Sequence, residues 1–159
     1  MKNNTELINI LKSLLEDELT AINQFMVHSE MCGNLGYKKL HDAIQKQAMD
    51  QMLHAEWLIE RISFLDSPSS LSDLNTIMIG KTVSEMICKT KSHEPHGFRA
   101  CKDAIKLASE VDDQDTVELL NRILKMEEGH VGWAEIQREL IGQNGLENYL
   151  ITQTGHLVH

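Results

Sequence analysis

Apolar residues recur every three or four positions along four long segments of this chain, a spacing that places them on one face of an α-helix. A shorter apolar stretch near the C-terminus follows Gly142 and Gly145, two residues that favour helix ends. The pattern therefore predicts four long helices and a short fifth one. Their predicted ranges are about 5–34, 37–65, 82–111, 115–141 and 146–153.

The connections between these segments predict how the helices pack. The two short ones, near residues 35–36 and 112–114, favour antiparallel helical hairpins. At ~1.5 Å per residue, each long segment would form a helix of about 40 Å. The connection from Asp66 to Lys81 is long enough to run the length of a bundle of such helices. Two hairpins joined by one long crossover indicate a single all-α domain over residues 1–159. The expected architecture is a ferritin-like four-helix bundle with a short C-terminal helix.

A spacing of polar residues occurs twice within this pattern. In each half, one glutamate is followed 33 positions later by a Glu or Gln and 36 positions later by a histidine. The two sets are Glu18, Gln51 and His54, and Glu94, Glu127 and His130. Di-iron carboxylate bundles use one Glu from each of two helices and a Glu-x-x-His pair from each of the other two. Only Gln51 departs from that arrangement.

These six residues lie on the apolar faces of their predicted helices. Glu18, for example, falls between Leu11 and Ile22 on the stripe of the first segment. Burying several polar groups without partners would be costly, whereas groups that surround a shared cation neutralise one another. The alternative is that each is an isolated buried polar group. The repeated spacing favours a metal centre at mid-bundle.

Composition narrows the class of protein. A net charge of −9 disfavours a nucleic-acid partner, which requires clustered Lys and Arg. The three cysteines, an odd number without framework spacing, are typical of reduced thiols in a cytoplasmic protein. The N-terminal residues do not form a signal peptide, and no stretch has the length of a membrane span. We therefore expect a cytoplasmic protein without a membrane partner.

Five segments carry a family resemblance: LINILKSLLEDELTAINQ from Leu7, MLHAE around His54, ERISFLDSPSSLSDLNTIMIG from Glu60, MEEGHVGW around His130, and GLENYL from Gly145. Over residues 1–155 the chain resembles the bacterioferritins. The resemblance implies an iron-storage shell of 24 subunits built from dimers. It also implies haem b between pairs of subunits and an electron donor that releases stored iron.

The same resemblance implies roles for the residues of the spacing that occurs twice. Glu127 would bridge two irons, while His54 and His130 would each cap one iron. Glu18 and Glu94 would each be a terminal ligand. This set suits iron and also zinc, so the ligand types do not select one metal.

Met52 stands at the family's haem-ligand position, with one such methionine supplied by each of two subunits. It follows Gln51 and is therefore rotated by about 100° from the bundle interior, as a ligand at a dimer interface must be. Spacing alone favours a packing role for Met52, and the resemblance favours the haem ligand. Candidates for the walls of the haem pocket are Leu19, Ile22, Asn23, Met26 and Met49.

Gln51 occupies a position where the family has a second bridging Glu. A neutral amide offers one modest oxygen donor and no charge. Two ferrous ions carry +4, whereas Glu18, Glu94 and Glu127 supply only −3. We therefore expect a weakened iron site and slowed oxidation of paired iron.

Three further departures point in the same direction. Pro95 follows Glu94 in mid-helix and predicts a kink or local unwinding that displaces the Glu94 carboxylate, with His93 and His96 as substitute ligands or solvent-facing residues. Phe25 replaces a Tyr near the iron site and removes a phenol able to give an electron. Lys46 replaces a cavity-facing His, while Asp50 is kept.

Three functions remain open on the sequence. The favoured one is an iron-storage cage subunit with reduced ferroxidase activity, in a homo-oligomer or with an active sister subunit. The second is a fully active ferroxidase that oxidises Fe(II) with dioxygen or peroxide. The third is a metal-free helical interaction module, which only the general frequency of amphipathic bundles supports.

Overall fold

The computed structural model describes residues 2–65 and 79–155, apart from the side chains of residues 2–4 and 89–97. Every regular element in this part of the chain is a helix. The helices are α1 (Lys2–Asn34), α2 (Lys38–Leu65), α3 (Val83–Glu110), α4 (Gln114–Asn144) and α5 (Leu146–Thr152). None of them is both long and apolar enough to cross a bilayer.

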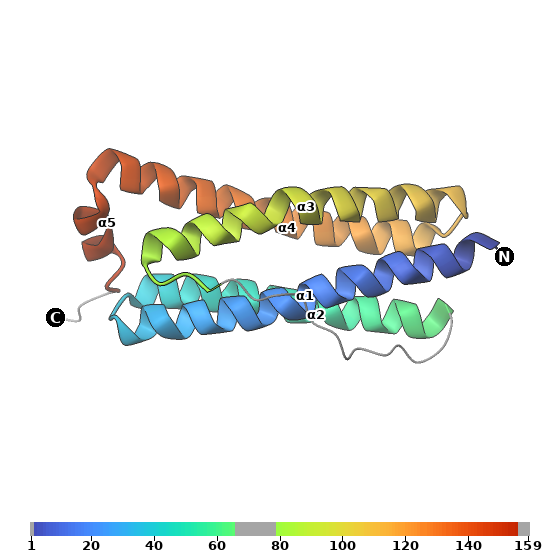
Figure 1. The fold of residues 1–159 in the computed structure, drawn as a ribbon, viewed down its shortest axis with the longest axis horizontal. Helices are drawn as coiled ribbons and strands as arrows, with labels where there is room; N and C mark the ends of the chain where they lie inside the picture. The colour runs from blue at the N-terminus through green and yellow to red at the C-terminus, as the bar shows by residue number, and fades with distance from the viewer. Residues whose placement is uncertain (1, 66–78, 156–159) are drawn as a thin grey trace.

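The four long helices lie side by side as two antiparallel hairpins, α1 with α2 and α3 with α4 (Figure 1). α2 ends at one end of the bundle and α3 begins at the other, so these two helices run in the same direction (Figure 1). This order confirms the predicted all-α four-helix bundle. The predicted crossover includes residues 66–78, which lie outside the described residues.

Apolar side chains form two core clusters, one towards each end of the bundle. The first holds Leu7, Leu11 and Leu15 of α1 together with Leu58 and Ile62 of α2, and the other two helices complete it. The second, at the α5 end, is built around Phe25, Leu40, Ile44 and Ile87. Full burial of one such side chain contributes about 1.5–3 kcal/mol to folding. The predicted polar positions fall between these two clusters.

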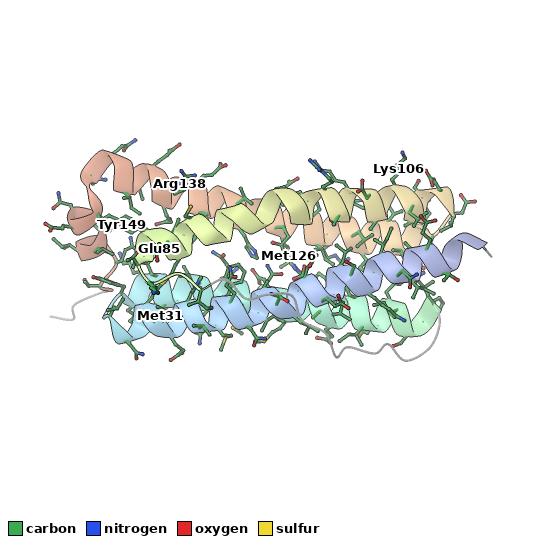
Figure 2. The ribbon with its side chains drawn as sticks, viewed as in Figure 1. Met31, Glu85, Lys106, Met126, Arg138 and Tyr149 are labelled. Atoms are coloured by element: carbon green, nitrogen blue, oxygen red, sulfur yellow. The ribbon has the colours of Figure 1, made fainter. Side chains whose placement is uncertain are left out.

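The small fifth helix is tied to the rest of the fold by one buried side chain. Tyr149 is 2% exposed, and its hydroxyl donates a 2.7 Å hydrogen bond to Gln137 Oε1 of α4. The backbone N–H of Lys39 in α2 donates to the carbonyl of Gln153, just beyond α5. Figure 2 shows Tyr149 at this end of the bundle.

Two predicted helix ends differ from the structure. α1 begins at Lys2 rather than near Thr5. α4 continues through Gly142 to Asn144 and stops at Gly145, whose φ is 80°. An interior glycine costs only about 1 kcal/mol, so the helical hydrogen bonds continue past Gly142. The positive φ of Gly145, with an extended ψ of 153°, is what ends the helix, and glycine adopts this conformation without a Cβ clash.

The proline of α3 does not interrupt the helix. The backbone is helical without a break from Val83 to Glu110, so the local unwinding expected at Glu94 and Pro95 is absent. A proline removes one N–H donor, and its helical neighbours can keep the remaining hydrogen bonds. The start of α3 is well fixed by a capping box, in which Thr82 Oγ1 accepts from the N–H of Glu85.

Candidate metal centre

Three of the predicted ligands meet at the middle of the bundle. Nδ1 of His54 on α2 lies 3.5 Å from Oε2 of Glu18 on α1 and 3.3 Å from Oε1 of Glu127 on α4. The His54 side chain is fully buried, and the two carboxylates are 11% and 15% exposed. One ligand atom from each residue lies within 4.8 Å of the others, so together they suit a small cation.

Two polar atoms at this point are buried without a hydrogen bond. Glu18 Oε2 and His54 Nδ1 face each other at 3.5 Å, which is an ion-pair distance, but neither makes a hydrogen bond. Leaving such groups buried and unpaired costs several kcal/mol in general, about 1–3 kcal/mol for each group. A metal ion bound by both atoms would remove that cost, so the residues present fit a cation.

The second ring nitrogen of His54 has a partner of its own. Nε2 lies 3.2 Å from the Sδ atom of Met126. If Nε2 carries the proton and donates it to this sulfur, a weak acceptor, Nδ1 keeps its lone pair for a metal. Figure 2 labels Met126 near the mid-length of the bundle.

His130 lies on the other side of Glu127. Its Nδ1 is 3.4 Å from Oε2 of Glu127, while its Nε2 is 3.0 Å from Oδ2 of Asp50. Asp50 also lies 3.7 Å from Nζ of Lys46, an exposed residue. The two oxygens of Glu127 therefore face different histidines, which is the placement that a bridging carboxylate needs.

The amide of Gln51 is directed into the same centre. Gln51 is 2% exposed, and its Nε2 lies 3.4 Å from Nδ1 of His130. Its Oε1 is buried without a hydrogen-bond partner. The residue thus takes the space of a ligand, but it presents amide hydrogens to the imidazole.

Ionisation equilibria in the centre reflect burial and the imidazoles together. Burial raises the pKa of Glu18 to about 7, although His54 opposes the shift. Burial also acts to raise the pKa of Glu127, but the nearby imidazoles of His130 and His54 outweigh it and lower this pKa to about 2. The pKa values of the two carboxyls are therefore shifted in opposite directions, upward for Glu18 and downward for Glu127.

The histidines are shifted towards their charged forms. Burial lowers the pKa of His54, but the carboxylates of Glu127 and Glu18 beside Nδ1 prevail and raise it to about 9. At His130, burial again lowers the pKa, while Glu127 and Asp50 raise it further than burial lowers it. A cation binding between these groups must displace protons that otherwise balance the carboxylates.

A small cavity of about 100 Å³ adjoins the cluster. Its polar wall residues are Asp17, Glu18, Gln24, Gln51 and Glu127, and apolar residues from all four long helices complete it. Phe25, 4% exposed, is part of the wall, so the ring at this position has no phenolic hydroxyl. Cys101 also lines the cavity, and burial raises the pKa of its thiol to about 12.

The remaining predicted residues either lie apart from this cluster or have side chains outside the described residues. The side chains of His93, Glu94 and His96 lie outside the described residues. Met52 is 43% exposed on the outer face of α2, although Gln51 beside it is buried. Met49 and Leu53 are exposed on the same helix.

Sequence reasoning missed the residues that hold the two imidazoles in place. Met126 directly precedes Glu127 and belongs to no periodic pattern that would mark it. Asp50 on α2 and His130 on α4 are 80 positions apart in the chain, and their contact joins the two helices.

Comparison with known proteins gives a consistent family. Residues 8–143 match the family model described as a ferritin-like domain. The "Bacterial ferritin" of Synechocystis sp. is 37% identical over 154 residues, which cover 96% of this chain and 99% of that protein. The "Bacterioferritin" of Mycobacterium avium is 34% identical over 94% of both chains, and that of Streptomyces coelicolor is 31% identical over 96% of this chain and 91% of its own.

The chain belongs to the ferritin family. Its relatives are bacterioferritins, as the sequence motifs indicated. Bacterioferritins are oligomeric cage proteins, and membership of this family supports iron storage as the function of this ferritin. The cluster of Glu18, His54 and Glu127 gives this ferritin a candidate metal-binding triad.

Proposed function

We propose that this ferritin is the iron-storage subunit of a bacterioferritin-type cage of 24 chains, in which its own di-iron ferroxidase centre is impaired. The observation that carries the impairment is Gln51, which is buried in the centre with its amide nitrogen 3.4 Å from His130 Nδ1. An amide there supplies neither the charge nor the second oxygen of a bridging carboxylate.

The proposed ligands form two iron positions at the centre. Fe(II), the substrate, is held by Glu18, His54 and Glu127 on one side. On the other side Glu94 and His130 are the ligands, and Glu127 is shared because its two oxygens face the two histidines. The oxidant is dioxygen or peroxide, and the ferric product is stored as mineral in the cage.

The charge balance explains why oxidation is slowed. Loss of one carboxylate removes a unit of negative charge from a buried site that must hold two divalent ions. A unit charge at ~4 Å contributes about 4 kcal/mol at an effective dielectric constant of 20. Since about 1.4 kcal/mol changes a rate or an equilibrium tenfold, a change well above tenfold is expected.

Haem b is the second proposed cofactor. Met52 is exposed on α2, next to the buried Gln51, and faces away from the metal centre. Met49 and Leu53 extend the same exposed surface. In the proposed dimer, Met52 of each of two subunits ligates one haem between them.

The shell is built either from this chain alone or together with an active sister subunit that oxidises iron for it. A slow centre is compatible with storage in a mixed shell, because iron oxidised by the sister subunit enters the same cavity. A shell of this chain alone would fill at the slow rate of its own centres. The protein is proposed to be cytoplasmic, where an electron donor releases the stored iron.

Iron oxidation tests the impairment. Fe(II) is mixed with the assembled protein under air, and the ferric absorbance is followed for the wild type and for Gln51→Glu. We expect the variant to be at least about tenfold faster in the initial phase. Gln47→Glu is the matched control, since Gln47 is a buried glutamine one turn earlier on α2 and is expected to leave the rate unchanged. Equal rates for wild type and Gln51→Glu would support a fully active ferroxidase instead.

Absorbance spectra test the haem. The purified protein is expected to show the Soret band of a bis-methionine haem, and Met52→Leu is expected to lose it. Met31→Leu is the control, because Met31 is a partly buried methionine that packs against the core near α5. A protein that binds neither haem nor iron would instead be a metal-free helical module.

A further inference from the structure

We infer that the centre of this ferritin is a one-metal site, which holds a single divalent cation between Glu18, His54 and Glu127 while Gln51 keeps a second cation from His130. The inference rests on the proposed function in one respect, that the same cluster binds metal. It goes further in stating how many cations bind and on which side.

The first side of the centre is prepared for a cation. Its three ligand atoms lie within 4.8 Å of one another and come from three different helices. Two of them, Glu18 Oε2 and His54 Nδ1, are buried and unpartnered, with His54 completely enclosed. A contact between His54 Nε2 and Met126 Sδ fixes the ring, so Nδ1 points to the two carboxylates.

The second side is occupied by hydrogen-bonding groups. Asp50 lies at Nε2 of His130, and both Glu127 Oε2 and the Gln51 amide nitrogen lie 3.4 Å from Nδ1. A cation at Nδ1 requires the neutral ring with its proton on Nε2, and in that tautomer Nδ1 is the acceptor to which the Gln51 amide donates. A cation bound at Nδ1 would have to displace this NH₂ group, whose hydrogens carry positive partial charge and repel it.

Formal charge leads to the same division. One divalent cation is neutralised by the carboxylates of Glu18 and Glu127. A second one would bring +2 to a buried position where Gln51 is neutral and where the Asp50 carboxylate faces the other ring nitrogen of His130. Charges left unbalanced in a protein interior are strongly unfavourable. The first cation therefore uses the charge that a second would need.

One imidazole and two carboxylates form a mixed ligand set that leaves positions open for water. Zn²⁺ and Fe(II) both accept such ligands. Zn²⁺ is the better probe, because it has no redox chemistry and so reports occupancy without oxidation.

Zinc binding by the assembled, full-length protein tests the inference. Protein is equilibrated with Zn²⁺ in a chelator buffer that strips weak surface sites, and bound zinc per chain is measured. We expect one zinc for the wild type and for the control Gln47→Glu, and two for Gln51→Glu. Adding His130→Ala to Gln51→Glu is expected to return the value to one. His54→Ala alone is expected to bind none.

Anomalous diffraction above the zinc edge gives a test that needs no variant. Crystals of the wild-type protein soaked in Zn²⁺ are expected to show one peak at mid-bundle, between Glu18, His54 and Glu127. A second peak beside His130 Nδ1 would overturn the inference, as would an empty position between Glu18 and His54.

The outcome is separable from that of the proposed function. Two zinc ions together with slow iron oxidation would reject the one-metal site and leave the impaired storage subunit standing. One zinc ion, with oxidation as fast as in Gln51→Glu, would uphold the one-metal site and reject the impairment.

Discussion

The sulfur of Met126 lies 3.2 Å from Nε2 of His54, on the opposite side of the ring from the two carboxylates. A thioether sulfur is a weak hydrogen-bond acceptor. Among the described residues, Met126 Sδ is nevertheless the polar contact of His54 Nε2. Partners of a ligand's second nitrogen orient the ring and select its tautomer. Met126 thus orients the imidazole of His54 although its own side chain is uncharged.

Met126→Leu keeps the volume of the side chain and removes the acceptor. We expect Zn²⁺ affinity to fall by about tenfold, the low end for loss of such a partner, because His54 can then rotate or change tautomer. Competition with a chromogenic chelator measures it, with Met31→Leu as the control. Unchanged affinity in Met126→Leu would show that packing alone orients the ring.

Tyr149→Phe tests how α5 is anchored. The variant removes the 2.7 Å hydrogen bond to Gln137 and leaves a buried amide oxygen without that donor. We expect a destabilisation of about 1–3 kcal/mol, seen as a lower midpoint of thermal unfolding. The test fails for our interpretation if the midpoint is unchanged, since the amide would then have found another donor.

Arg61 joins α2 to the turn between α3 and α4. Its Nη2 donates to Asp113 Oδ1 at 2.6 Å and its Nε to Thr116 Oγ1 at 2.8 Å, with both ionic side chains mostly buried. Arg61→Lys keeps the charge but loses the forked geometry, so we expect a loss of about 1–2 kcal/mol.

The exposed ion pair Lys38–Asp42 is the matched control for Arg61. It is also short, 2.7 Å, but its side chains are 69% and 54% exposed. Lys38→Gln is expected to change stability by less than about 1 kcal/mol, because water screens the pair. If both variants had the same effect on chemical denaturation, burial would not be what distinguishes the pairs.

Gly80 precedes α3 in a position without room for a side chain. An added Cβ would lie 2.7 Å from the backbone nitrogen of Met86, and the Gly80 N–H donates to His28 Nε2 at 2.9 Å. Gly80→Ala is expected to destabilise the protein by about 1–3 kcal/mol, because backbone must shift. Gly142→Ala, where nothing lies within 4 Å of the added carbon, is expected to be neutral or stabilising in the same denaturation experiment.

The three thiols are expected to differ in reactivity. Burial raises the pKa of Cys32 to about 11 and that of Cys101 to about 12, so neither forms appreciable thiolate at pH 8. Cys88 is exposed. An aromatic disulfide reagent should therefore titrate one thiol per native chain and three after denaturation. Cys88→Ser should abolish the fast phase, and a second fast thiol would contradict the burial of the other two.

The sequence was sufficient to predict what depends on regular spacing. Helical periodicity predicted the bundle, and the intervals of 33 and 36 residues predicted that Glu18, His54 and Glu127 share one level of it. These three side chains lie together because their helices have similar lengths and pack side by side.

Contacts that depend on side-chain conformation were beyond the sequence. The sequence indicated that Gln51 weakens the centre, but not that its amide nitrogen faces His130. Nor did it predict the contact of Met126 with His54, which depends on how far α4 is rotated against α2. At Gly142, local propensity predicted a helix end, whereas Gly145, with its positive φ, decides it.

The candidate metal ligands come from both hairpins, with Glu18 and His54 on the α1–α2 pair and Glu127 on the α3–α4 pair. A cation that binds all three can do so only when the hairpins are docked, so its binding energy is added to the cohesion between them. Each hairpin is built from local contacts that form quickly, whereas docking joins residues that are far apart in the chain. Loading with metal should therefore slow the separation of the two halves far more than the fraying of either one.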